Sequence, residues 1–212
     1  MDHADTSLWV ATAAELRDRV ASTDPTPGGG SVSIVTATLG LALIQKGVVV
    51  SLKKSAADIA RHQKLLDLNL AISNLIVSLS AFADADSFAF KSYLEAGALP
   101  QTTEGEVALR RAAREAHIVK ATQIPIESAV KMGTGVELGE AAAKVIDAHV
   151  RSEVLAGVVL LRASIKGVLL SVDANLSRIS NSALRDTLKL QRSELERAFT
   201  LPPELVADLR QS

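Results

Sequence analysis

The strongest constraint on the fold is an apolar stripe with helical spacing between residues 65 and 79. Apolar side chains recur there every three or four positions, at Leu65, Leu68, Ile72, Leu75, Ile76 and Leu79. This spacing places them on one face of a helix and does not match the two-residue repeat of a strand. The β-branched cluster at 48–50 lies inside a longer helical pattern. The sequence therefore predicts an all-α fold.

The helical patterns together predict a bundle of six to eight helices. We expect helices over about 6–22, 31–54, 55–97 (in one or two pieces), 103–125, 127–131, 139–179 and 181–199. Thr103 and Glu106 have the spacing of a capping box at a helix start. Pro125 should kink its helix or begin a new one, because proline lacks the N–H donor. The sequence GTG at 133–135 predicts a short break, and LPPE at 201–204 predicts a helix end.

Length and composition limit the possible classes of protein. The 212 residues are enough for one domain with a substantial core, so we expect residues 1–212 to form a single domain. Lysine and arginine number 23 against 24 acidic residues, a balance that does not predict a nucleic-acid partner. The N-terminus lacks the order of a signal peptide, which favours a cytoplasmic location. Gln45 and Lys46 interrupt the apolar segment 32–52, so we interpret it as a buried core helix and not as a membrane span.

Neither cysteine nor histidine chemistry is indicated. The chain contains no cysteine, which excludes disulfides, thiolate nucleophiles and cysteine-ligated metals. His62, His117 and His149 do not have the spacing of metal ligands relative to one another. We therefore expect no metal site.

Three consecutive glycines, in the sequence PTPGGGSV at 25–32, precede the most apolar helix. Ordering glycine is entropically costly, so it is favoured where the backbone needs unusual angles or approaches another group closely. Ser31 is the expected N-cap, and the free N–H groups of a helix start favour an anionic group. A plain connector is the alternative. The pattern does not match a nucleotide-binding P-loop.

Several motifs occur in the same order and with similar spacing as in the formiminotransferase-cyclodeaminase C-terminal domain family, which includes methenyltetrahydrofolate cyclohydrolases. PTPGGGSV resembles the family's glycine signature, and two lysines end the following helix at 53–54. DSFAF at 86–90 resembles a D-x-x-A-F pattern, and LPQTT at 99–103 resembles L-P-K-x-T. ATQIP at 121–125, HVRSE at 149–153 and VDAN at 172–175 resemble further family elements. The resemblance covers roughly residues 12–180.

Some polar positions depart from the family pattern. VVSLK at 49–53 replaces Asn-Leu-Thr-x-Gly, Gln101 replaces a lysine, His149 replaces an asparagine, and Glu153 replaces an aspartate. These differences leave open a second interpretation, in which the chain acts on another substrate.

The resemblance implies a bundle of the cyclodeaminase/cyclohydrolase type and a folate-dependent reaction. Family members hydrolyse 5,10-methenyltetrahydrofolate to 10-formyltetrahydrofolate or convert 5-formiminotetrahydrofolate to the methenyl form with loss of ammonia. Both reactions need a base but no metal, because the substrate carbon is already electrophilic. We therefore expect a tetrahydrofolate derivative as substrate and no tightly bound cofactor.

The resemblance also implies roles for individual residues. Asp86 is the expected base, because its apolar surroundings should raise the pKa of the carboxyl group; Asp84 should lie on another helix face. The remaining expected site residues are Glu153 as a second catalytic carboxylate, and Gly28, Gly29, Gly30, Ser31, Lys54, Arg110, Ser152 and Asn175 as substrate-binding residues.

Three functions follow as hypotheses. The length of the chain favours a stand-alone cyclohydrolase over the bifunctional cyclodeaminase, which carries a further transferase region. A divergent enzyme with another substrate is the second, and a non-catalytic helical binding or scaffold protein is the third. A buried Asp86 beside a pocket would favour an enzyme. The resemblance also implies a homodimer, for which the apolar segment 154–172 and the charged C-terminal helix are suitable surfaces.

Overall fold

The structure, a computed structural model, describes residues 7–199 and confirms the all-α class, with no strand in that range. Its elements are η2 (Leu8–Val10), α1 (Ala13–Val20), α2 (Gly29–Leu52), α3 (Ile59–Gly97), α4 (Glu104–Ala143), η3 (Ala148–Val150), α5 (Arg151–Leu176) and α6 (Ser182–Phe199). The predicted helix end at 201–204 lies outside the described residues.

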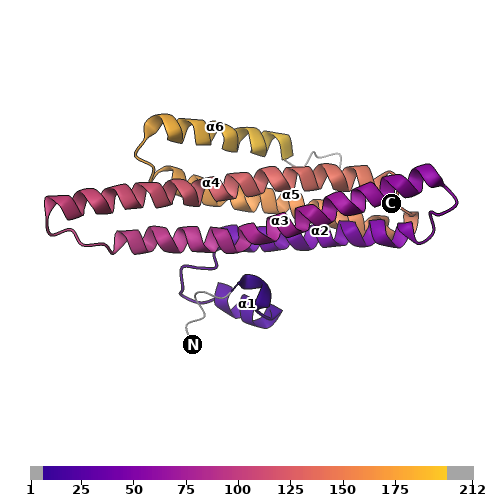
Figure 1. The fold of residues 1–212 in the computed structure, drawn as a ribbon, viewed down its shortest axis with the longest axis horizontal. Coiled ribbons are helices and arrows are strands. Elements are labelled where there is room, and N and C mark those ends of the chain that lie inside the picture. Colours follow the sequence, from indigo (N-terminus) through magenta and orange to yellow (C-terminus); the bar gives the residue numbers. More distant parts are fainter. Residues whose placement is uncertain (1–6, 200–212) are drawn as a thin grey trace.

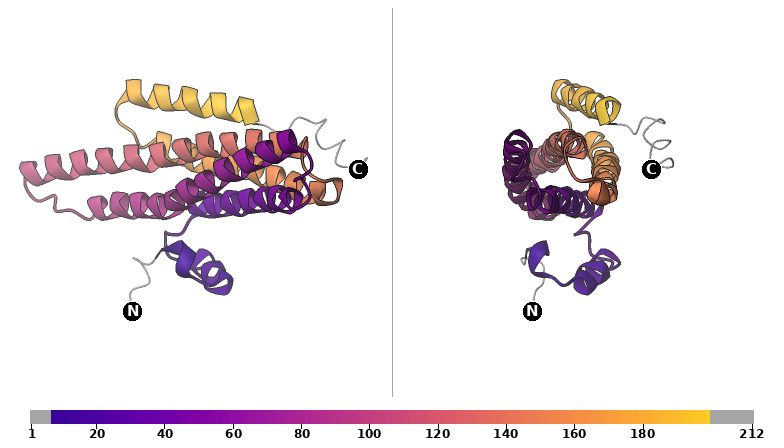
Figure 2. Two further views of the ribbon diagram at one scale, coloured as in Figure 1. Left: turned by 45° about the vertical axis from the view of Figure 1, so that its right-hand side comes forward. Right: turned by 90° about the vertical axis from the view of Figure 1, so that its right-hand side faces the viewer.

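Four long helices, α2 to α5, surround a common core (Figure 1). The end-on view in Figure 2 shows α6 on one side of this bundle and α1 on the opposite side. Helices α3 and α4 continue past the start of α2 and the end of α5, so they form a two-helix arm on the left of Figure 1. The functional site described below lies where α2 begins and α5 ends.

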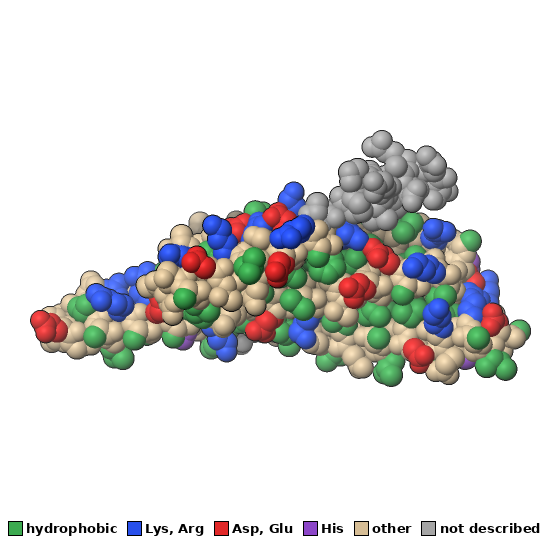
Figure 3. Space-filling view, turned by 90° about the horizontal axis from the view of Figure 1, so that it is seen from above, with side chains coloured by type: hydrophobic (Ala, Val, Ile, Leu, Met, Phe, Trp, Pro, Cys, Tyr) green, Lys and Arg blue, Asp and Glu red, His purple; other side chains and the backbone are tan. Residues whose placement is uncertain are grey.

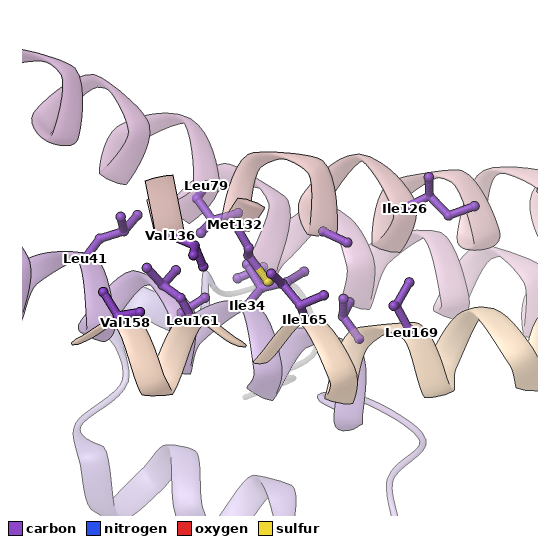
Figure 4. Packing of buried hydrophobic residues seen from close by; sticks show 14 of the residues in the cluster. Ile34, Leu41, Leu79, Ile126, Met132, Val136, Val158, Leu161, Ile165 and Leu169 are labelled. Atoms are coloured by element: carbon purple, nitrogen blue, oxygen red, sulfur yellow. The ribbon is translucent and has the colours of Figure 1, made fainter. Parts of the chain in front are cut away.

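The core consists of aliphatic side chains contributed by all four long helices. Ile34 and Leu41 of α2, Leu79 of α3, Met132 of α4 and Leu161 of α5 are completely buried and interlock at the centre of the bundle (Figure 4). Each such side chain contributes roughly 1.5 to 3 kcal/mol by burial. The stripe recognised in the sequence at 65–79 is part of this core.

Helices α2 and α5 pack unusually closely because each carries a glycine at the crossing. A Cβ atom on Gly40 would lie only 2.9 Å from the carbonyl oxygen of Gly157. The same use of small residues explains the segment at 133–135, where we expected a break. A Cβ atom on Gly135 would lie 2.9 Å from the Leu41 side chain, so this glycine admits a neighbouring helix and α4 continues without interruption.

Pro125 also fails to end or divide α4, which runs as one helix from Glu104 to Ala143. A proline at this position cannot donate to the carbonyl of Ala121, four residues earlier. The side-chain amide of Asn175 on α5 donates to that carbonyl instead, at 3.0 Å. A tertiary hydrogen bond thus replaces the missing helical one. At its N-terminus, α4 has the predicted capping box of Thr103 and Glu106.

The predicted helix at 139–179 is instead divided between α4 and α5 by a turn at 144–150. Asp147 in this turn forms an ion pair with Arg61 of α3, at 2.6 Å. Arg61 also donates to the carbonyl of Val145, and the N–H of Asp147 donates to the Ser51 hydroxyl. These contacts with α2 and α3 stabilise a turn that the local sequence does not predict. The segment 55–97, expected as one or two pieces, forms the single helix α3 from Ile59 to Gly97.

The N-terminal segment is not one helix over 6–22. Thr12 and Glu15 form a capping box, so α1 begins only at Ala13 and η2 is separate. Asp84 of α3 holds η2, because it accepts hydrogen bonds from the Ser7 hydroxyl at 2.7 Å and the Leu8 N–H at 2.8 Å. Within the described part of this segment Leu8 is buried, but α1 buries no residue.

The charged helix predicted at 181–199 is confirmed as α6. It packs on α4 and α5 with Leu188 buried, and Arg192 forms two hydrogen bonds of 2.8 Å with the Asp173 carboxylate of α5. Viewed from above, this face carries acidic and basic side chains intermixed with apolar ones (Figure 3).

Three helical segments are long and apolar enough to cross a membrane when judged by length and composition alone: Gly29–Leu52, Ile59–Gly97 and Ala148–Leu176. In the bundle, one face of each contributes to the core. Gly29–Leu52, which we interpreted as a buried core helix, has half of its most apolar window buried.

Candidate active site

A cavity of about 230 Å³ lies where α2 begins and α5 ends. Residues from α2 and the preceding loop, α3, α4 and α5 line it: Pro25, Thr26, Gly28, Gly29, Gly30, Ser31, Asp86, Phe90, Ala121, Ser171, Ala174, Asn175 and Arg178. The walls are glycine backbone, one aromatic ring and mostly small side chains, with one carboxylate (Asp86) and one guanidinium (Arg178) among them. We call this space the Asp86 cavity.

The Asp86 carboxylate is held against the first turn of α2. Its Oδ2 atom accepts a hydrogen bond from the Ser31 hydroxyl at 2.7 Å, and the Ser31 hydroxyl lies 2.8 Å from that of Ser87. Burial raises the pKa of Asp86 above its ordinary value, although the Ser31 hydroxyl and backbone N–H oppose this shift by stabilising the carboxylate. The carboxyl group is therefore fixed in position and more basic than an exposed one, as predicted.

The three glycines have different roles. A Cβ atom on Gly30 would lie 2.6 and 2.8 Å from the two oxygens of Asp86, which is too close for any other residue without movement. Gly29 has open space around its Cβ position, and Gly28 is the N-cap, with extended backbone. No glycine in the described range has a positive φ angle. The close approach of a carboxylate explains Gly30, and unusual backbone angles explain none of the three.

The start of α2 differs from the expectation in one respect. Gly28 is the N-cap, and Ser31 is the third residue of the helix, where its side chain serves Asp86. The Asp86 carboxylate thus supplies part of the negative charge expected at this helix start. The backbone N–H groups of Gly29 and Gly30, which line the cavity, make no hydrogen bond with the described residues and are available to a ligand.

Asn175 and Arg178 form the wall contributed by α5 and the residues after it. Asn175 is only 5% exposed, and its amide donates to the carbonyl of Ala121 while its oxygen accepts from Arg178 at 3.1 Å. Phe90 lies one helical turn after Asp86 on α3 and faces the same cavity. Sequence reasoning did not select Phe90 or Arg178 as site residues, although their spacing of four and three positions from Asp86 and Asn175 indicates shared helix faces.

Asp84 does not belong to this site, in agreement with the prediction. Its carboxylate binds Ser7 and Leu8 at the N-terminal segment. The two nearby aspartates therefore differ in function, one anchoring η2 and the other facing the cavity.

Three expected site residues lie at the opposite end of the bundle. Lys54 follows the end of α2, whereas Gly30 is at its start, and a 24-residue helix is roughly 36 Å long. Ser152 and Glu153 lie at the start of α5, whereas Asn175 is near its end. Glu153 forms an ion pair with Lys46 at 2.5 Å. Within one chain the fold separates these three residues from Asp86, contrary to our expectation of a shared site, because the motifs fall at opposite ends of long helices.

Arg110 lies close to the site but outside the Asp86 cavity. It lines an adjoining cavity of about 430 Å³, which Arg178 also lines, and it donates a hydrogen bond to the Gln101 side chain. Among residues 7–199 there is no group of three or more histidine, aspartate or glutamate side chains positioned to hold a metal ion.

Comparison with known proteins identifies the family of this chain. Residues 12–194 match the family model described as formiminotransferase-cyclodeaminase. The chain belongs to the formiminotransferase-cyclodeaminase family. It is 30% identical over 179 residues to formimidoyltransferase-cyclodeaminase of Gallus gallus and 25% identical over 177 residues to methenyltetrahydrofolate cyclohydrolase of Methylorubrum extorquens.

The alignment covers different fractions of these two relatives. The aligned region covers 81% of this chain but only 32% of the chicken protein, so the chain spans about a third of that relative. It covers 82% of this chain and 84% of the Methylorubrum protein. The crystal structure of formiminotetrahydrofolate cyclodeaminase from Thermotoga maritima has the same fold, with a TM-score of 0.78 over 90% of this chain and 91% of the other, at 21% identity.

Proposed function

We propose that this family member is a folate-dependent one-carbon enzyme that hydrolyses 5,10-methenyltetrahydrofolate to 10-formyltetrahydrofolate. The observation that carries the proposal is the Asp86 carboxylate, which is partly buried, has a raised pKa and is fixed by Ser31 at the edge of a cavity. A scaffold protein has no need for a desolvated carboxylate facing a cavity, so this arrangement favours an enzyme.

The proposed reaction needs a base and positioned donors. Water attacks the amidinium carbon between N5 and N10 of the substrate while Asp86 accepts a proton from that water. Asp86 returns the proton to N5 as the bond between the carbon and N5 breaks, and loss of the remaining hydroxyl proton leaves the formyl group on N10. Overall, one water is consumed and one proton is released. A base with a raised pKa suits both proton transfers.

The surrounding residues have supporting roles in this proposal. The N–H groups of Gly29 and Gly30 are suitable donors for the pterin carbonyl, and Phe90 offers an aromatic face to the aminobenzoyl ring. The Ser31 hydroxyl positions Asp86. We propose that the enzyme needs no tightly bound cofactor, because the substrate itself supplies the electrophilic carbon.

Formiminotetrahydrofolate cyclodeaminase is the second candidate, favoured by the 30% identity to the chicken relative. Its reaction passes through a tetrahedral centre at the same carbon, so the same carboxylate would serve. Two absorbance assays distinguish the candidates. A cyclohydrolase accelerates loss of the methenyltetrahydrofolate band, and a cyclodeaminase forms that band from 5-formiminotetrahydrofolate.

The decisive comparison is between Asp86→Asn and Asp84→Asn. Both remove one carboxylate from the same helix, but only Asp86 faces the cavity. We expect Asp86→Asn to lower kcat on the order of 10² to 10⁴-fold, the usual contribution of a general base, and Asp84→Asn to retain kcat. Because burial raises the pKa of Asp86, its ionisation opposes folding above the folded-state pKa, so Asp86→Asn should keep or raise the melting temperature at neutral pH. Equal activity of wild type and Asp86→Asn would refute the assignment.

We further propose that the protein is a cytoplasmic homodimer with no nucleic-acid or membrane partner. The outer faces of α2 and α5 support a dimer, because Leu39 is 56% exposed, Leu170 is 61% exposed, and Leu155, Val159 and Leu160 line an open groove. Light scattering coupled to gel filtration measures the mass of the particle. A monomer at micromolar concentration would contradict the dimer.

A dimer would also give Glu153 a place in the site. The face formed by α2 and α5 runs from the Asp86 end of the bundle to the Glu153 end, so an antiparallel pair would set these ends against each other. If the site is shared, mixing inactive Asp86→Asn with inactive Glu153→Gln chains restores activity, because some pairs contain one intact site. Full activity of Glu153→Gln alone would exclude a catalytic role for that residue.

A further inference from the structure

Beside the Asp86 cavity, an arginine pocket of about 430 Å³ lies on the arm formed by α3 and α4. Arg110, Arg111 and Arg114 line it from α4, Arg178 lines it from the segment after α5, and Tyr93 lines it from α3. Figure 3 shows basic side chains on this narrow arm. Four guanidinium groups around one cavity repel one another unless an anion is bound between them.

The pocket does not neutralise this charge by itself. Its one acidic lining residue, Glu115, already accepts hydrogen bonds from the backbone N–H groups of Ser180 at 2.9 Å and Asn181 at 3.1 Å. Arg111 has no ion pair with the described residues, and the Nε atom of Arg110 is buried without a hydrogen-bond partner among them. The pocket therefore carries an excess of donors and of positive charge.

Two of the arginines are already held in place by Tyr93. Arg114 donates to the Tyr93 hydroxyl at 2.8 Å, and its guanidinium lies 5.2 Å from the centre of the ring. The Arg178 guanidinium lies 5.9 Å from the same centre. Planar donors that are held in this way can bind carboxylates with two hydrogen bonds each and with little further loss of side-chain freedom.

The arginine pocket and the Asp86 cavity adjoin each other along α3, and Arg178 lines both of them. Asp86, Phe90 and Tyr93 follow one another at intervals of four and three residues, so they share a helix face. The Phe90 and Tyr93 rings are 6.1 Å apart. Arg178 lines both spaces and donates to Asn175. Across the two adjoining cavities, a carboxylate, an aromatic ring and a cluster of arginines therefore follow one another.

This order matches a molecule with a reactive carbon, an aromatic ring and a terminal dicarboxylate. We propose that the arginine pocket binds the glutamate carboxylates of the folate substrate through Arg111, Arg114 and Arg178 in addition to Arg110, and that Arg178 connects this subsite with the Asp86 cavity. The inference rests on the proposed function, because it takes a folate as the ligand. Lys54, which the resemblance implies as a substrate-binding residue, lies at the other end of the bundle and is not part of this subsite.

The test compares two substrates and three proteins. The substrates are 5,10-methenyltetrahydrofolate and the corresponding pteroate, which lacks glutamate. The proteins are wild type, Arg111→Gln and the control Arg197→Gln, which removes an exposed arginine near the end of α6 that lines neither cavity. We expect Arg111→Gln to raise KM for the folate roughly tenfold with kcat unchanged, because one charge-assisted contact is lost. It should leave KM for the pteroate unchanged, and Arg197→Gln should change neither.

Arg178→Gln is the second variant, and it should raise KM for the folate in the same way. An equal KM for the folate in wild type, Arg111→Gln and Arg178→Gln would overturn the proposal, as would equal increases for both substrates. The wild-type KM for the folate should also rise with ionic strength more steeply than that for the pteroate.

A binding experiment separates failure of the subsite from failure of the proposed function. Calorimetry with p-aminobenzoylglutamate needs no turnover, and we expect roughly tenfold weaker binding to Arg111→Gln than to wild type or Arg197→Gln. If wild type hydrolyses no folate but shows this difference, the proposed reaction fails and the carboxylate subsite stands. If wild type does not bind the probe, or if inorganic phosphate at equal ionic strength displaces it at lower concentration than glutamate does, the subsite assignment is overturned.

Discussion

The hydrogen bond between Asn175 and the carbonyl of Ala121 leads to a prediction about stability that does not depend on any activity. Pro125 cannot donate to that carbonyl, and the Asn175 amide donates in its place at 3.0 Å. Both partners are buried, with Asn175 5% and Ala121 3% exposed. Asn175→Ala should therefore leave a buried carbonyl without a partner, which costs about 1 to 3 kcal/mol.

A second substitution isolates this cost. Pro125→Ala restores an N–H group that can donate to the Ala121 carbonyl within the helix. In that background, Asn175→Ala still creates the same cavity and still removes the contact with Arg178, but it no longer leaves the carbonyl unpaired. We expect Asn175→Ala to be less destabilising by about 1 to 3 kcal/mol in the Pro125→Ala protein than in wild type.

The measurement is urea unfolding of all four proteins of the double-mutant cycle, followed by circular dichroism. The free energies of unfolding give the coupling between the two positions directly. Thermal unfolding should show the same pattern, at about 2 to 4 °C for each kcal/mol in a chain of this size. Effects that add to within about 0.5 kcal/mol would refute the reasoning, because they would show that Asn175 does not compensate for the proline.

Three further predictions concern the site and the N-terminal segment. Gly30→Ala should displace the Asp86 carboxylate by about 0.8 Å, because the new Cβ atom would otherwise lie 2.6 Å from its oxygen and an ordinary contact is about 3.4 Å. This displacement should lower kcat/KM on the order of 100-fold. The control Gly105→Ala, at the same position of α4 with open space around it, should retain activity. Ser31→Ala removes a hydrogen bond that lowers the pKa of Asp86, so the acidic limb of the pH–rate profile should move to higher pH, and an unmoved limb would contradict this role. Asp84→Asn should weaken the anchoring of η2 and speed proteolysis within residues 7–21, while cleavage at the wild-type rate would show that the anchor is unimportant.

The site was partly predictable, because several of its residues lie within short segments. The glycines and Ser31 belong to one motif, and Asp86 belongs to another whose apolar surroundings predicted the raised pKa that the structure confirms. Lys54, Ser152 and Glu153 were grouped with Asp86 through motif resemblance alone. A motif does not show at which end of the bundle its residues lie. Motif resemblance therefore groups these residues with Asp86, although within one chain they lie at the opposite end of the bundle.

The sequence by itself determined the helical class, the apolar stripe and the capping boxes, because these depend on contacts within about four residues along the chain. Only the tertiary structure decided where helices continue or end. The Ala121 carbonyl, to which Pro125 cannot donate, accepts a hydrogen bond from Asn175 on another helix. The turn between α4 and α5, which has no local sequence signal, is stabilised by the ion pair of Asp147 with Arg61. The need for glycine at position 30 was decided in the same way, because the carboxylate that excludes a side chain there comes from a residue 56 positions away in the sequence.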